Sequence, residues 1–231
     1  MKIFGYSERG IINSLIFNIG ENMELMNKFL QLITIPTSLD LEEPTDYTIL
    51  LEQSLSRFGD SDLIIIVKYK NPADNIVLFF EGKVKTSQVN WKINSQFNKY
   101  NSNEQYSGYS SNLFFQLYLK KLLIENYTEI KENGEVLEPQ FGDNRKIGNN
   151  PIVLNAFDLI KCNKAYYIGI VPTLNEDLKQ FTDSSISEIY FLSWETIHEF
   201  CKDNNLEKVL EVFDYNKEQI YAPKFHTSGY S

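Results

Sequence analysis

Three charged residues stand at the ends of two apolar stretches of this sequence. Asp62 comes directly before the apolar run 63–67, Glu81 comes directly after the run 76–80, and Lys83 follows two positions later. Runs of β-branched and aliphatic residues predict buried strands. A charge in a buried strand is costly unless it is paired or binds a metal ion. These three side chains are therefore the first candidates for chemistry.

The spacing of the three residues predicts that they converge. Glu81 and Lys83 are two positions apart, so on one strand they project from the same face. The turn signal Asn-Pro-Ala-Asp-Asn at 71–75 predicts a β-hairpin whose register pairs Asp62 close to Val84. Two carboxylates that converge repel one another and call for a cation. Oxygen ligands of this kind suit Mg²⁺ or Mn²⁺.

An acid, an apolar strand, a turn, a second apolar strand and then Glu-x-Lys form a pattern that resembles the PD-(D/E)XK nuclease superfamily. Its members include restriction endonucleases and repair or recombination nucleases. The resemblance implies that Asp62 and Glu81 bind a metal ion, with the carbonyl of Gly82 as a candidate third ligand. It implies that Lys83 orients or activates the attacking water.

Flanking features extend the resemblance to about residues 6–125. The Gly-x-x-Asp approach at 59–62 is common in the superfamily, although a serine here replaces the usual proline. An N-terminal helix bearing a glutamate often precedes the hairpin, and Glu8 fits that place. Gln96 and Tyr100 have the Gln-x-x-x-Tyr spacing found after Glu-x-Lys in RecB-like exonucleases, which implies a role in substrate binding.

Each flanking residue also has a plainer interpretation. Glu8 is equally explained as an acid that interacts favourably with the dipole at a helix N-terminus. Glu52 is a candidate ligand from the preceding strand, or an ordinary surface acid. Gln96 and Tyr100 lie one helical turn apart and face the same side, which is also common on plain helix surfaces.

The pattern of elements predicts an α/β fold, with a mixed central β-sheet flanked by helices around a restriction-endonuclease-like core. We expect strands at 47–55, 62–69, 76–85, 165–171 and 188–192. We expect helices at 7–32, 88–100, 112–126, 194–201 and 206–213. Ser7 is a plausible N-cap of the first helix, which Gly20 kinks or divides. The Gly- and Asn-rich segment 132–150 predicts an exposed excursion.

Composition favours one folded domain over residues 1–231. Apolar residues make up 42% of the chain and aromatic residues 14%, enough for a sizeable core. The nuclease-like core is expected at about 6–125, with strands and helices at 160–215 completing or extending it. Cys162 and Cys201 fit no metal spacing and, in a chain this long, favour a reducing compartment. With no leader-like or membrane-spanning run, we expect a cytoplasmic protein without a membrane partner.

The net charge of −9 counts against nucleic-acid binding, because phosphate contacts usually require a basic face. Its distribution softens the objection. Residues 81–100 hold four lysines and one acid, whereas residues 172–231 hold eleven acids and five lysines.

We therefore expect a Mg²⁺-dependent nuclease, a phosphodiester hydrolase that acts on DNA, with Mn²⁺ able to substitute. The alternative is a non-catalytic binding or assembly protein of the same fold. DNA versus RNA, the mode of cleavage and a homodimer stay open.

Overall fold

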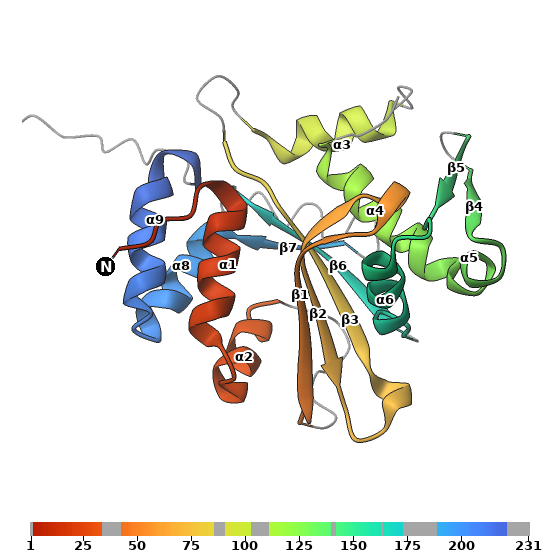
Figure 1. Ribbon diagram of the computed structural model, residues 1–231. Coiled ribbons are helices and arrows are strands. Elements are labelled where there is room, and N and C mark those ends of the chain that lie inside the picture. The colour runs from red at the N-terminus through yellow and green to blue at the C-terminus, as the bar shows by residue number, and fades with distance from the viewer. Residues whose placement is uncertain are drawn as a thin grey trace, which may run out of the picture.

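The computed structural model describes residues 2–33, 43–85, 91–102, 111–139, 142–162, 164–172 and 189–220. Its centre is a five-stranded mixed sheet in the order β1-β2-β3-β6-β7 (Figure 1). The first three strands are antiparallel neighbours, and β6 and β7 run parallel to β3. The strands are β1 (Asp46–Ser54), β2 (Asp60–Lys68), β3 (Ile76–Gly82), β6 (Lys164–Val171) and β7 (Ile189–Ser193).

Helices cover both faces of this sheet (Figure 1). One face packs against α1 (Ser7–Ile19), α2 (Met23–Leu30), α8 (Trp194–Asp203) and α9 (Glu207–Ile220). The other packs against α4 (Leu113–Glu125), α5 (Tyr127–Asn133) and α6 (Pro151–Leu159), and α3 (Ile93–Asn101) packs on α4. The prediction of an α/β fold with a mixed sheet flanked by helices is confirmed.

Strands β2 and β3 lie at the centre because they are apolar on both faces. Leu63 and Phe80 point into the core beside α1, whereas Ile64 and Phe79 point into the core beside α4. The sequence of a strand that is buried on both faces is a continuous apolar run rather than an alternation of apolar and polar residues. The alternation also assigns faces: the even positions of β2 and the odd positions of β3 point to the α4 side.

The register of the hairpin differs from the predicted one. Leu63 lies opposite Phe80, so Asp62 is level with Glu81 and not with Val84. Strand β3 also ends at Gly82, three residues earlier than expected. The turn explains the difference, because its centre lies earlier in the sequence. Asn71 caps a short 3-10 turn at Pro72–Asp74.

Most other predicted elements are confirmed, with corrections at their ends. The first helix divides at Gly20, whose φ of +54° ends α1, and Asn22 caps α2. Ser7 is the first residue of α1 rather than its cap, which is Tyr6. Helix α3 begins at Ile93, not at 88; residues 86–90 lie outside the described part of the chain. Pro36 and Pro44 also predict a loop at 35–45, most of which lies outside the described part.

Most described residues of the segment 132–150 are exposed, as expected, but the segment is a folded hairpin. It forms a hairpin of β4 (Glu135–Glu138) and β5 (Asp143–Lys146) that packs beside α5. Glu138 and Arg145 are buried there. Tyr118 donates to Glu138, and Arg145 lies over the ring of Phe115. These contacts, with the hydrogen bond from Arg145 to the carbonyl of Arg57, pack a Gly- and Asn-rich stretch against the domain.

Candidate active site

Asp62 stands near the start of β2, where the backbone of the next strand holds its carboxylate. Oδ2 accepts a hydrogen bond of 2.8 Å from the backbone amide of Gly82. Oδ1 lies 3.3 Å from Nε of Arg9, on α1. The residue is only 6% exposed, and burial raises the pKa of its carboxyl group. The Gly82 amide and the charges of Lys83 and Arg9 oppose that rise.

Glu81 is the most deeply buried acid of the candidate site. It is 1% exposed, and burial raises the pKa of its carboxyl group to about 7. The charge of Lys120 lowers this pKa, whereas the charge of Asp62 raises it further. The charge of Asp62 therefore reaches the carboxyl group of Glu81, as expected of acids that converge.

Lys120 is the partner of Glu81 that sequence reasoning missed. It lies on α4, is fully buried, and places Nζ 3.3 Å from Oε1 of Glu81. Nζ also donates to the carbonyls of Phe58 at 3.0 Å and Asp60 at 2.7 Å. A signal for it exists in the sequence. Position 120 follows 113 and 117 on the helical stripe that carries buried leucines, so a lysine there must find acceptors inside the protein.

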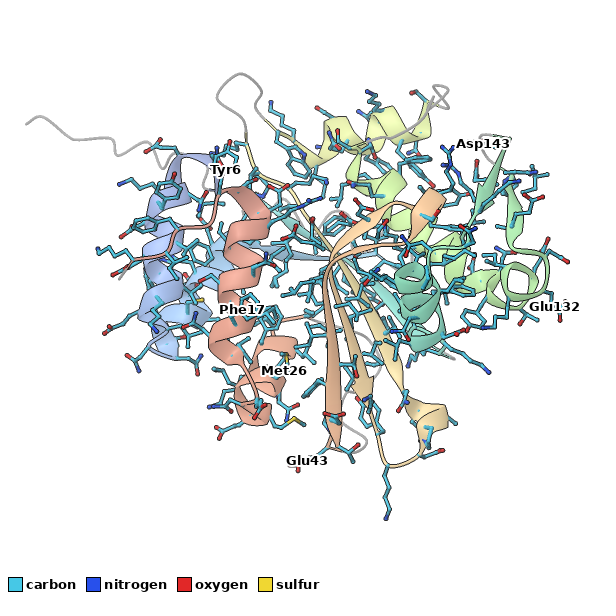
Figure 2. The ribbon with its side chains drawn as sticks, in the orientation of Figure 1. Tyr6, Phe17, Met26, Glu43, Glu132 and Asp143 are labelled. Carbon is cyan, nitrogen blue, oxygen red and sulfur yellow. The ribbon has the colours of Figure 1, made fainter. Side chains whose placement is uncertain are left out.

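Glu8 reaches the site because Gly82 has no side chain. A Cβ at Gly82 would lie 2.8 Å from Cβ and 3.1 Å from Cγ of Glu8, closer than real Cβ atoms approach. The first turn of α1 therefore packs directly on the end of β3. The charge of Glu8 raises the pKa of Asp62, so the two carboxylates are electrostatic neighbours. Tyr6 marks this end of α1 (Figure 2).

Glu52 joins the site through Arg9. The register of β1 and β2 places Glu52 level with Asp62, because Leu51 pairs with Leu63. Nη1 of Arg9 lies 3.4 Å from Oε2 of Glu52, and Asn13 donates to the other carboxylate oxygen of Glu52. The φ of Glu52 is +48°, a sparsely populated conformation that often marks functional sites. Arg9, half-exposed between two acids, is a second residue that sequence reasoning missed.

Lys83 follows β3 directly and is fixed by its backbone. Its amide donates to the carbonyl of Ile170, and its carbonyl accepts from Nε1 of Trp194. The side chain is half-buried, and among the described residues its ammonium has no ion-pair partner. Its charge nevertheless lowers the pKa of both Asp62 and Glu81. Lys83 is thus close to both acids without being tied to either.

Gln96 and Tyr100 are engaged with α4. Oε1 of Gln96 accepts from the amide of Leu113 at 3.1 Å, and its carbonyl accepts from the side chain of Asn112. Tyr100 packs against the rings of Phe114 and Tyr118. The contacts that the structure shows for this pair therefore stabilise the start of α4 and its packing against α3.

The donor set at the ends of β2 and β3 fits a hard divalent cation. Oε1 of Glu81 is buried and has no hydrogen-bond partner among the described residues; its contact with Lys120 is an ion pair. A buried oxygen in that state favours a further ligand. Within the same described ranges, no three His, Cys, Asp or Glu side chains are grouped tightly enough to hold a metal ion. Asp62 and Glu81 would have to act with a backbone carbonyl and water, as Mg²⁺ commonly allows.

Two further findings bear on the setting of this site. No helix in the described part of the chain is long and apolar enough to cross a membrane. Comparisons with protein-family models, with curated proteins and with solved structures found no match.

Proposed function

We propose that this protein is a metal-dependent nuclease that hydrolyses phosphodiester bonds in DNA, built on a restriction-endonuclease-like core of the PD-(D/E)XK type. The observation that carries the proposal is the meeting of Asp62 and Glu81. Both carboxylates are buried, the charge of Asp62 raises the pKa of Glu81, and Oε1 of Glu81 is left without a hydrogen-bond donor in the described structure. Buried acids in such an arrangement are commonly functional rather than structural.

In this proposal the residues have separate roles. Asp62, Glu81 and the carbonyl of Gly82 hold a Mg²⁺ or Mn²⁺ ion, which when bound supplies Lewis-acid polarisation and lowers the pKa of a bound water. Lys83 orients that water and adds positive charge beside the phosphate in the transition state. Its half-buried ammonium suits the role because no carboxylate among the described residues is paired with it.

Arg9 is a natural contact for a substrate phosphate. Its side chain is 50% exposed at the edge of the site, and guanidinium groups bind phosphate oxygens in a bidentate geometry. Glu8 and Glu52 border the site rather than complete it. Glu8 influences the charge of Asp62, and Glu52 orients Arg9. Gln96 and Tyr100 contribute to substrate binding only indirectly, through the position of α4.

A non-catalytic binding or assembly protein is the second candidate, and one observation favours it. Both acids already have a protein cation: Arg9 lies beside Asp62 and Lys120 beside Glu81. A fold stabilised by such pairs has no need of a metal ion. The net charge of −9 also opposes binding to a polyanion.

The test is cleavage of single- and double-stranded DNA, with free ends and as circles, in millimolar Mg²⁺ or Mn²⁺. We expect metal-dependent cleavage by the wild-type protein and none by Asp62→Asn. The variant Asp46→Asn is the matched control, since Asp46 is a surface acid paired with Lys68 at the other end of the sheet. Wild-type protein that binds Mn²⁺ yet cleaves none of these substrates, nor RNA, supports the second candidate.

A further inference from the structure

The ammonium of Lys120 joins three parts of the chain at one point. It contacts the carbonyl of Phe58 in the turn before β2, the carbonyl of Asp60 at the start of β2, and the carboxylate of Glu81 in β3. Two of its N–H groups donate to these carbonyls, and the ammonium forms an ion pair with Glu81 at 3.3 Å. A fully buried lysine is rare, and these three contacts explain why this one is tolerated.

The turn that Lys120 contacts sets the place of Asp62. It comprises Ser56–Phe58 and Gly59, and both Ser56 and Gly59 have positive φ. A Cβ at Gly59 would lie 3.2 Å from Nζ of Lys120, so the turn is closely fitted to the ammonium. The chain enters β2 directly after this turn, and Asp62 is only two residues beyond the Asp60 carbonyl that Lys120 binds.

We propose that Lys120 is a positioning residue, which holds the Glu81 carboxylate and the turn before Asp62 in a fixed relative position. The inference rests on the proposed function only for its consequence in metal binding and cleavage. The turn and the start of β2 each contribute one backbone acceptor and β3 contributes one acid, so a single side chain from α4 controls the separation of the two carboxylates. Functional side chains keep their geometry when neighbouring residues hold them by packing and hydrogen bonds, and they lose it without that support.

Positioning and mere charge compensation predict opposite results for Mn²⁺ affinity. If Lys120 only neutralises Glu81, then Lys120→Met removes a competing cation and Mn²⁺ binds more tightly. If Lys120 positions the acids, the same variant binds Mn²⁺ at least tenfold more weakly. We expect the weaker binding, measured by electron paramagnetic resonance titration of free Mn²⁺ at a temperature where every variant is folded. Unchanged or tighter binding overturns the inference.

The neighbouring Lys121 provides the matched control. It is partly exposed on the same helix and pairs with Glu125, away from the site. Lys121→Met should bind Mn²⁺ as the wild type does. Equal losses in the two variants would show a general effect of removing positive charge from α4, and would count against positioning by Lys120.

A metal-free arm separates this inference from the proposed function. The amide of Gly82 donates to Oδ2 of Asp62, so its hydrogen exchange reports directly on how firmly the acid is held. We expect Lys120→Met to speed hydrogen exchange of this amide at least tenfold in chelator. Amides at the far end of the β2–β3 pair should keep the same ranking of exchange rates among themselves. Unchanged exchange overturns the inference, even if the wild type binds no metal and the nuclease proposal fails independently.

A second variant covers the case in which Lys120→Met does not fold. The double variant Lys120→Met/Glu81→Gln leaves no unpaired buried charge but still deprives the turn of its ammonium. Faster exchange of the Gly82 amide than in Glu81→Gln alone supports positioning. Identical exchange in the double and single variants contradicts it.

Discussion

The backbone amide of Gly82 donates to Oδ2 of Asp62 at 2.8 Å, so the peptide between Glu81 and Lys83 holds the acid of the neighbouring strand. The Glu-Gly-Lys triplet therefore does more than supply two side chains. Its middle residue fixes the carboxylate opposite, and its lack of a Cβ admits α1 beside it.

Divalent ions should stabilise the protein through Asp62 and Glu81. A ligand that binds only the folded state raises its free energy of unfolding, by about 2.7 kcal/mol at a free concentration 100 times Kd. We expect Mg²⁺ and Mn²⁺ to raise the Tm, and Asp62→Asn to abolish that rise while Asp46→Asn retains it. A Tm that does not change in millimolar Mn²⁺ would remove the main support for the metal site.

Loss of Lys83 should affect the chemistry far more than the stability. Its ammonium has no ion-pair partner among the described residues, so Lys83→Ala should change the free energy of unfolding in saturating Mn²⁺ by no more than about 0.5 kcal/mol. Cleavage should fall by on the order of 10²–10³, the usual loss for a transition-state contact. Lys85→Ala, two residues along, is the control. A Lys83→Ala variant that cuts normally would exclude this role.

The buried acid should make stability depend on pH. Burial raises the pKa of Glu81 from 4.5 to about 7, so between these values the folded state binds more protons than the unfolded state. The stabilisation that protonated Glu81 gives the folded state is fully present below about pH 4.5 and is lost as the pH rises to about 7. In chelator, the unfolding free energy of wild type minus that of Glu81→Gln should therefore fall across this window. Denaturant titrations that give a constant difference would contradict the prediction.

A side chain at position 82 should destabilise the fold. Gly82→Ala places a Cβ 2.8 Å from Cβ of Glu8, which is attached to the backbone of α1 and cannot rotate away. Overpacking of this kind costs about 1–3 kcal/mol. The variant Glu8→Gly removes the opposing atom, so in a double-mutant cycle the two changes should show a favourable coupling. Additive losses in urea unfolding would show that the two residues do not meet.

Gln96 offers a direct choice between a structural role and substrate binding. Its side chain accepts the amide of Leu113 at the start of α4, so Gln96→Ala should cost about 1 kcal/mol of stability, as the loss of a helix cap does. The exposed Asn98 on the same helix gives a control, Asn98→Ala, that should cost little. If Gln96→Ala weakens DNA binding without lowering the Tm, Gln96 contacts the substrate instead.

The sequence by itself determined the character of the central strands and the residues at their ends. Continuous apolar runs over 63–67 and 76–80 are sufficient to predict buried strands, because only burial on both faces favours such runs. Alternation along β3 then places Glu81 and Lys83 on the same side of the sheet. These are local regularities, so they can be recognised without knowing the fold.

The tertiary structure alone decided the register and the partners of these residues. A hairpin centred between residues 71 and 72, rather than at 73, shifts the partner of Asp62 from Val84 to Glu81. The cap at Asn71 was not evident from the turn composition. Arg9 and Lys120 come from helices on opposite faces of the sheet, and Lys120 is 62 positions from the Phe58 carbonyl that it binds. Periodicity tells which side of a helix is buried, but the acceptor that a buried lysine meets depends on how distant elements pack together.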